Sequence, residues 1–229
     1  MRIDIVTIFP DFVRQALNHS IIGRARSAET VHIAACDLRD FTKDKRRTVD
    51  DSPYGGGAGM VLKPEPLFEA VDSLRTESSR VILMSPQGTT FTQQKAVELS
   101  NQEHLILLCG HYEGFDERVR EHLVDEEISI GDYVLTGGEL AALAIVDSTV
   151  RLLPGVLGNS ESLSSESFEE HLLEYPQYTR PVEYRGWTVP DVLLSGHHEQ
   201  VAQWRRKQQE EITRLKRPDL WRKHIDSKK

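Results

Sequence analysis

The sequence has few cysteines, few aromatic residues and no long apolar run. Cysteine occurs only at Cys36 and Cys109 among 229 residues, and aromatic side chains make up 7%. No apolar stretch reaches the ~18 residues of a transmembrane helix. The opening residues, MRIDIVTIFP, lack the basic and apolar regions of a signal peptide. Because no metal-binding or redox spacing links the two cysteines, we expect buried, reduced thiols in a cytoplasmic protein.

The net charge of −8 conceals two regions of opposite sign. Residues 200–229 contain ten Lys and Arg against four Asp and Glu, whereas residues 1–199 contain 18 against 32. A basic helical tail on an acidic body favours a polyanion-binding module. An ordinary solvated helix is the alternative, and charge by itself leaves both open.

Strand and helix patterns alternate through the first two thirds of the chain. The runs VILM and LILLC are apolar without alternation, as in parallel strands that are covered on both faces. We therefore predict an α/β domain with a parallel sheet over residues 1–157. Asp11 is expected to cap its first helix. Strands are expected at 3–8, 31–38, 80–85, 105–110 and 127–130, and helices at 10–25, 65–74, 92–99, 117–123 and 139–153.

A long polar segment, 39–60, interrupts this alternation. A plain connection in a compact domain is shorter, so the length indicates a functional loop. Its basic run at 43–47 precedes a glycine-rich run at 55–59. No Walker Lys-Ser/Thr follows, which argues against a nucleotide P-loop. Backbone contact with a nucleic acid and a flexible tether are the two interpretations.

Two glycine-punctuated turns, CGHYEG at 109–114 and IGDYVLTGGE at 130–139, each follow an apolar strand pattern and precede a helical one. A third loop, PQG at 86–88, follows another predicted strand. In an open α/β sheet such turns lie at the carboxyl ends of the strands, where small ligands bind. Glycine there lets the backbone approach a flat ligand closely. We interpret residues 105–140 as a cofactor pocket.

The remaining residues differ in composition. GNSESLSSES, at 158–167, contains five serines and one apolar residue, which predicts a linker. Residues 168–229 are predicted to form a small, mostly helical domain. Its buried face is expected to contain Val201, Trp204, Ile212 and Leu215. The adjacent His197 and His198 fall in a turn, so no metal site is predicted there.

Seven motifs, taken in order, resemble the bacterial tRNA (guanine-N1)-methyltransferases. That family belongs to the knotted, SPOUT-like α/β methyltransferases, which use S-adenosylmethionine. Each motif is weak alone, but the ordered set is specific. The matching segments are VDDSPYGGGAGM (49–60), SPQG (85–88), CGHYEGFDERV (109–119), SIGDYVLTGGEL (129–140), RLLPGVLGN (151–159), SFEEHLLEYPQYTRP (167–181) and VPDVLLSGHH (189–198).

The resemblance implies a fold and an activity. The three loops named above would form a deep trefoil knot, which general topology rules would not predict. The reaction would methylate N1 of guanine 37 in tRNA, next to the anticodon. The resemblance also implies a homodimer, in which the linker and the helical tRNA-binding domain of one subunit serve the cofactor pocket of the other.

The resemblance also implies roles for individual residues. Guanine N1 carries a proton at neutral pH, so a base must remove it, and a fixed cation would stabilise the charge on the exocyclic oxygen. Glu166 stands where the family has an aspartate as the general base, with Glu161 or Glu169 as the alternative. Arg151 matches the catalytic arginine; its alternative role is to face a helix dipole.

Further positions are implied to contact ligands. The guanine contacts would be Asp50, Gly59 and Ser167. Members of the family are helped by Mg²⁺, although the sequence contains no cluster of metal ligands. Ribose 2′-O-methylation, or RNA binding with the cofactor held only as a ligand, are the competing functions. The implied S-adenosylmethionine contacts are Pro86, Gly110, Glu113, Ile130, Gly131, Asp132, Tyr133, Val134, Leu135, Gly137 and Gly138.

Overall fold

The computed structural model describes residues 1–158 and 166–228. The chain divides into two compact units, Met1–Gly158 and Asn159–Lys229. Only the two ends of the predicted linker, 158–167, fall within the described residues. In these residues no helix combines the length and the apolar character that crossing a lipid bilayer requires.

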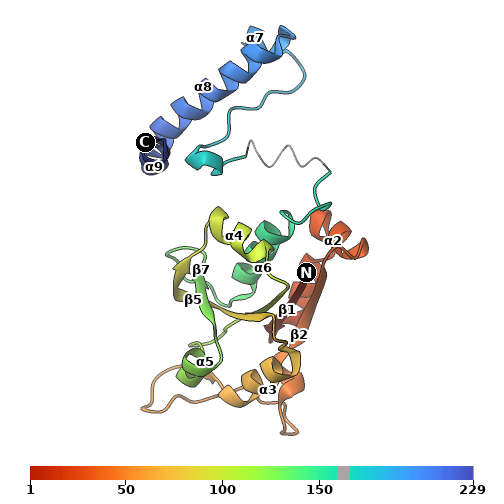
Figure 1. The fold of residues 1–229 in the computed structure, drawn as a ribbon. Helices are drawn as coiled ribbons and strands as arrows, with labels where there is room; N and C mark the ends of the chain where they lie inside the picture. The colour runs from red at the N-terminus through yellow and green to blue at the C-terminus, as the bar shows by residue number, and fades with distance from the viewer. Residues whose placement is uncertain (159–165, 229) are drawn as a thin grey trace. The chain divides into compact units, whose positions relative to one another are not determined.

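A five-stranded parallel sheet forms the centre of the first unit (Figure 1). Its order is β2-β1-β6-β5-β7, so the central β6 pairs with β1 on one side and with β5 on the other. This confirms the predicted α/β class with a parallel sheet. The strands are β1 (Arg2–Thr7), β2 (His32–Asp37), β5 (Ser79–Thr90), β6 (His104–Leu108) and β7 (Glu126–Ser129).

Both faces of the sheet are buried, because successive strand residues point to opposite sides. Ile82 belongs to one apolar cluster and its neighbour Leu83 to the other. The first cluster includes side chains of α1 (Pro10–Ala16), α2 (Ser20–Ser27), α4 (Gln93–Ser100) and α6 (Glu139–Val150). The second includes side chains of α3 (Pro64–Leu74) and α5 (Glu117–His122).

The prediction of one helix over residues 10–25 is wrong, because the chain turns between α1 and α2. Ser20 has a positive φ of 55° at the start of α2. A Cβ on Gly23 would lie 2.5 Å from the carbonyl oxygen of Asn18, so glycine allows the close return of the chain. Asp11 is not the cap: Phe9 holds that position, and Pro10 begins the helix.

The long segment predicted as a loop, 39–60, is partly ordered by its neighbours. A 3-10 helix, η1 (Leu38–Phe41), opens it. Near its end β3 (Asp50–Asp51) pairs antiparallel with β4 (Val61–Leu62). The Leu62 amide donates to the carbonyl oxygen of Gly114 over 2.9 Å, which fixes the base of the loop to the turn after β6.

Two other element boundaries differ by three residues or more from those predicted. β5 continues to Thr90 rather than ending at residue 85, but its register with β7 shifts between Met84 and Thr89. The motif at 85–88 lies within this irregularity, so it leaves the regular strand pairing as the predicted loop would. The last helix of the first unit, α6, ends at Val150 rather than at residue 153, and Arg151 is its C-cap residue.

The second unit is mostly helical, as predicted. Leu215 is 81% exposed, so its predicted burial is wrong; the buried residues here include Thr213, Leu220 and His224. A short hairpin was not predicted; its turn residues, Arg185 and Gly186, both have positive φ. The elements are η3 (Glu169–His171), β8 (Glu183–Tyr184), β9 (Trp187–Thr188), α7 (Asp191–Leu194), α8 (His198–Lys216) and α9 (Pro218–Ser227).

Candidate functional site

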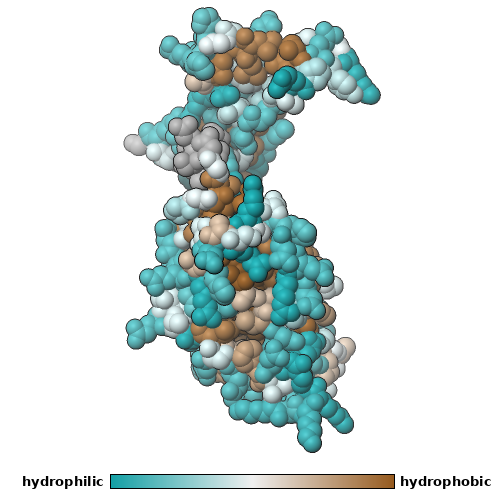
Figure 2. Space-filling view, turned by 90° about the vertical axis from the view of Figure 1, so that its right-hand side faces the viewer, coloured by the Kyte–Doolittle hydropathy of each residue, from teal (hydrophilic) through white to brown (hydrophobic). Residues whose placement is uncertain are grey.

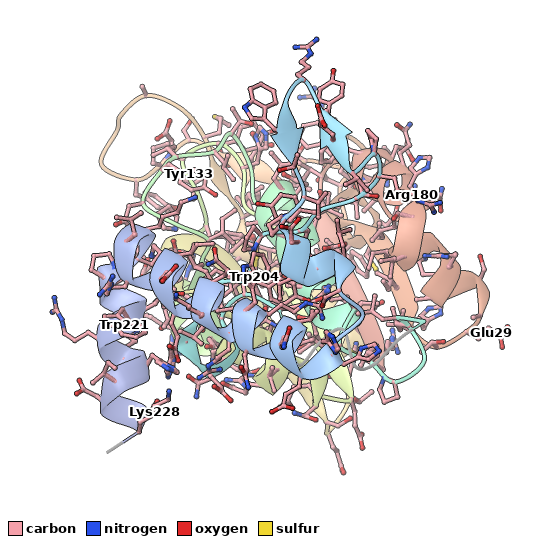
Figure 3. All side chains as sticks on the ribbon, turned by 90° about the horizontal axis from the view of Figure 1, so that it is seen from above. Glu29, Tyr133, Arg180, Trp204, Trp221 and Lys228 are labelled. Atoms are coloured by element: carbon pink, nitrogen blue, oxygen red, sulfur yellow. The ribbon has the colours of Figure 1, made fainter. Side chains whose placement is uncertain are left out.

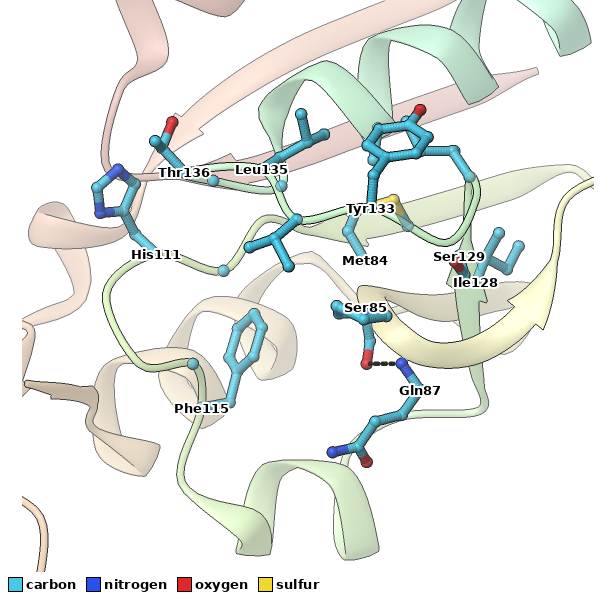
Figure 4. Close-up of a pocket in the computed structure, with 18 of the residues that line it drawn as sticks. Met84, Ser85, Gln87, His111, Phe115, Ile128, Ser129, Tyr133, Leu135 and Thr136 are labelled. Carbon is cyan, nitrogen blue, oxygen red and sulfur yellow. Dashed lines mark hydrogen bonds between the residues drawn. The ribbon is translucent and has the colours of Figure 1, made fainter.

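A cleft of about 380 Å³ lies in the first unit, at the ends of β6 and β7 and beside the irregular stretch of β5 (Figure 4). Three loops line it, at 84–87, 110–115 and 128–138. These are the three loops singled out from the sequence. Small-molecule sites have volumes of roughly 300–1,000 Å³, so the cleft has the size of a cofactor site. All the residues predicted to contact the cofactor line this cleft, except the exposed Asp132.

Two of the loops touch each other through their backbones. The amide of Gly138 donates to the carbonyl oxygen of Gly110 over 2.8 Å, and His111 and Gly137 form an isolated antiparallel bridge. A Cβ on Gly138 would lie 2.9 Å from the Cα of Cys109 and 2.9 Å from the amide nitrogen of Gly110. Glycine is therefore required where α6 begins, because any side chain would push the loops apart.

Two other glycines, Gly110 and Gly131, allow aromatic rings to pack against the backbone at the wall of the cleft. A Cβ on Gly110 would lie 2.5 Å from the ring of Phe115, which lines the cleft. One on Gly131 would lie 2.7 Å from the ring of Tyr133. Flat rings and exposed backbone thus form much of the wall, and this suits a flat heterocycle that is recognised by backbone groups.

Polar groups of the cleft come from the irregular stretch of β5, from α5 and from the end of β7. The hydroxyl of Ser85 accepts from the amide of Gln87 over 3.1 Å and from Arg120 over 3.2 Å (Figure 4 shows the first of these). Arg120 also pairs with Glu127 on β7. Ser129 accepts from the amide of Gly131 over 3.2 Å. The bond that Ser85 accepts from the amide of Gln87 closes a turn at the motif SPQG.

The long loop reaches the cleft at Glu113. The amide of Glu113 donates to the carbonyl oxygen of Met60, the last residue of the loop, over 3.0 Å. A Cβ on Gly59 would lie 2.2 Å from an oxygen of the Glu113 carboxylate, and Gly59 has a φ of +85°. The structure therefore brings Gly59, predicted to contact guanine, against Glu113, predicted to contact the cofactor. Asp50 is the other residue of the long loop that is predicted to contact guanine. It is half-buried in the β3–β4 pair at the base of the loop.

A buried carboxylate, that of Glu139, lies next to the glycine-rich loop at the start of α6. Glu139 is 6% exposed at the first turn of α6 and accepts from the hydroxyl of Thr7 over 2.7 Å. The positive end of a helix dipole stabilises a carboxylate in this position. Burial raises the pKa of the Cys109 thiol well above its usual value, and the charge of Glu139 adds to the effect. Cys109 is therefore a neutral thiol at physiological pH.

The two predicted catalytic residues belong to different units. Arg151 is half-buried at the end of α6, in the first unit. Glu166 is half-buried in the second unit, next to Ser167, whose hydroxyl accepts from the amide of Glu174 over 3.1 Å. Of the alternative bases, Glu169 opens η3, and Glu161 lies outside the described residues.

Several residues of the cleft were not singled out as ligand contacts from the sequence. Phe115 and Arg120 lie in or next to a quoted motif, but their approach to the cleft depends on which strands are neighbours. His111 lines the cleft, with its ring 5.0 Å from that of Phe9, and its Nδ1 is buried without a hydrogen-bond partner in the described chain. No group of three or more potential metal ligands gathers within residues 1–158 and 166–228.

The parallel sheet and its glycine-lined cleft define an α/β protein with a cleft suited to a small, flat ligand at the carboxyl edge. Comparison with known proteins identifies the family. The family model described as tRNA (Guanine-1)-methyltransferase TrmD matches residues 1–223. The chain belongs to this family, which confirms the resemblance found in the sequence. By this membership it is an S-adenosylmethionine-dependent methyltransferase.

Individual relatives are similar over nearly their whole length. A tRNA (guanine-N(1)-)-methyltransferase of Gloeobacter violaceus is 61% identical, over 96% of this chain and 98% of its own. One of Brevibacillus brevis is 59% identical, over 97% of this chain and 92% of its own. One of Geobacillus kaustophilus is 57% identical, over 96% of this chain and 91% of its own. The similarity therefore extends across both units.

Proposed function

We propose that this chain transfers a methyl group from S-adenosylmethionine to N1 of guanine 37 in tRNA. The observation that carries the proposal is the glycine-lined cleft, formed by the loops that carry the family's motifs. The enzyme would act in the cytoplasm, since its substrate is tRNA and both of its cysteines are free thiols.

The cleft fits S-adenosylmethionine in size and in character. Its backbone groups near Gly110 and Gly138 would contact the adenosine, where a Cβ would collide with the neighbouring loop. The carboxylate of Glu113 would face the positively charged methionine end. When bound, S-adenosylmethionine supplies a methyl group that is electrophilic because it is attached to a sulfonium. The contact of Gly59 with Glu113 would then hold the guanine-binding loop at the end from which the methyl group leaves.

Glu166 would accept the N1 proton of guanine, and Arg151 would stabilise the negative charge on the exocyclic oxygen. The reference pKa values of Asp and Glu are about 3.9 and 4.3, so the glutamate has the basicity of the family's aspartate. Its extra methylene changes reach instead. The guanine must also leave the stack of the anticodon loop to enter the site, as in other enzymes that modify bases.

Single-turnover methyl transfer to a tRNA transcript with guanine at position 37 tests the base. Wild type should produce 1-methylguanosine, and Glu166→Gln should be slower by about 10²- to 10⁴-fold, the usual contribution of a general base. Glu166→Asp keeps the carboxylate and should keep most of the rate. Glu161→Gln and Glu169→Gln are the matched controls; a large loss in either of them, with Glu166→Gln near wild type, would overturn the assignment.

The proposal includes a homodimer with sites shared between subunits. It is supported by large apolar side chains on the surface of the first unit, including Phe12, Val134 and Leu140 at 49%, 88% and 52% exposure. Where such side chains form a contiguous patch, they commonly mark an interface. The cleft of one subunit, with its Arg151, would receive Glu166 from the other.

Mixing two inactive variants tests this arrangement. If Arg151→Ala and Glu166→Gln subunits exchange, each mixed dimer has one site with both residues intact. Random exchange should then restore about a quarter of wild-type activity. Activity that stays at the level of the separate variants, although native mass spectrometry shows mixed dimers, would mean that each subunit completes its own site.

The proposal also includes the trefoil knot of the family. The close passage of Gly138 against the backbone of Gly110 supports it, as does the strand order, in which β7 lies on the far side of β5 from β6. The chain must cross its own path to reach α6 if it is threaded in this way. Continuous electron density through residues 84–151 of a crystal would decide the threading, and an unthreaded path would remove this part of the proposal.

A further inference from the structure

A second cleft, of about 350 Å³, lies entirely within the second unit. It is formed by the segment 175–182, by Val189, by α7 and by the first half of α8. Trp204 lies on α8, and Arg180 lies in the segment that precedes the β8–β9 hairpin (Figure 3). None of the residues considered so far for cofactor or guanine binding takes part in it.

Aromatic rings and arginines are its main functional groups. The guanidinium carbon of Arg205 lies 4.7 Å from the centre of the Tyr175 ring. The rings of Tyr178 and Trp204 are 6.4 Å apart at an angle of 55°. Arg180 also lines the cleft. These groups offer flat apolar faces beside two permanent positive charges.

Among the described residues that line this cleft there is no aspartate or glutamate. The chain as a whole is acidic, with 36 Asp and Glu against 28 Lys and Arg. The wall of this cleft, with its two arginines, is therefore positively charged on a negatively charged chain. A flat anion complements it in both shape and charge, whereas a cationic or purely aliphatic ligand does not.

The cleft is also open to solvent. Tyr178 is 49% exposed and Leu194 is 53% exposed. Figure 2 shows apolar surface, in brown, gathered on this unit. The only aliphatic side chains that the described part of the unit buries are Leu172 and Leu220, and neither of them lines the cleft. The cleft is thus separate from the small core of the unit, and its rings are available to a ligand.

We propose that this cleft binds one unstacked nucleotide of the tRNA substrate, other than the guanosine that is methylated. The base would stack on Tyr178 or Trp204, and the phosphate would lie at Arg180 and Arg205. Base–aromatic stacking and arginine–phosphate contacts are the common means of holding single-stranded nucleic acid. This inference rests on the proposed function, because tRNA is the polyanion that supplies such a nucleotide.

Tryptophan fluorescence gives a direct measurement. The chain has three tryptophans, so Trp187→Phe with Trp221→Phe leaves Trp204 as the only reporter. Adding a tRNA transcript should quench its emission with a saturable curve. In the same background, Arg205→Ala should raise the Kd for tRNA about tenfold, near the range of a charge-assisted hydrogen bond to phosphate. The rate at saturating tRNA and the affinity for S-adenosylmethionine should stay unchanged.

Arg214→Ala is the matched control, since it removes the same charge from an exposed position on the same helix. It should raise the Kd much less and should leave the quenching of Trp204 intact. Equal effects of the two variants would show that only total charge matters, and this would overturn the inference.

Two other results would also overturn it. One is a Trp204 signal that does not respond to tRNA, although wild type forms 1-methylguanosine. The other is a signal that depends on protein concentration without RNA, with sedimentation shifted by Arg205→Ala; the occupant would then be a second copy of the chain. Failure of the proposed function is distinguishable, since wild type would then methylate no tRNA, while quenching by a single-stranded RNA oligomer would still report on the cleft.

Discussion

The methyl group of an alanine at position 138 would meet backbone atoms of the neighbouring loop at 2.9 Å. Backbone cannot rotate away as a side chain can, so Gly138→Ala must separate the two loops that line the proposed cofactor cleft. We expect a loss of about 1–3 kcal/mol in the free energy of unfolding, and affinity for S-adenosylhomocysteine at least tenfold weaker, measured by calorimetry. Gly158→Ala is the control, since nothing lies within 4 Å of its added atom. Equal affinities for the two variants would contradict the tight passage.

The ionisation of Cys36 makes the stability of the folded chain depend on pH. Burial, and then the neighbouring Asp4, raise its pKa to about 11 from 9.0. Between these values the folded chain keeps a proton that the unfolded chain has lost, so this thiol's contribution to stability is complete below pH 9 and is lost as the pH rises towards 11.

Alkylation by iodoacetamide measures this shift, because the thiolate is the reactive form. At pH 9 the folded Cys36 should react about fiftyfold more slowly than the same thiol in denaturant. Mass spectrometry of the labelled peptide separates Cys36 from Cys109. Labelling of the native protein with a midpoint near pH 9 would contradict the raised pKa.

At the scale of elements, local sequence patterns identified the strands and the cleft, because both depend on short-range signals. Unbroken apolar runs mark the buried strands, and glycines after them mark the turns at the carboxyl edge. The break between α1 and α2 could not be predicted in this way. The apolar spacing continues across it, and the turn depends on the approach of Gly23 to the carbonyl of Asn18.

The β8–β9 hairpin and the side walls of the cleft were missed for different reasons. The hairpin has strands of two residues each, too short for any alternation, around an Arg-Gly turn rather than the commoner Asn-Gly. Phe115 and Arg120 reach the cleft only because β5 lies between β6 and β7, and that order is a long-range property of the sheet.

At the scale of the whole molecule, the two units differ in how much they bury. The first unit contains both apolar clusters of the sheet, so a fragment of residues 1–158 should fold alone. We expect a cooperative thermal transition and binding of S-adenosylhomocysteine, but no methyl transfer to tRNA, because the proposed general base, Glu166, is missing. Full-length Glu166→Gln is the matched comparison. A fragment that melts without a transition would show that the first unit needs the second to fold.

Main-chain atoms at glycines form part of the wall of the cleft that is proposed to hold S-adenosylmethionine, and this matters for inhibitor design. A compound that fills the space between Gly110 and Gly138 meets a surface that mutation can alter only by adding atoms. Each added atom would narrow the space that S-adenosylmethionine also needs. Escape from such a compound would therefore have to arise outside this wall, at exposed side chains such as Val134, or through increased expression of the enzyme.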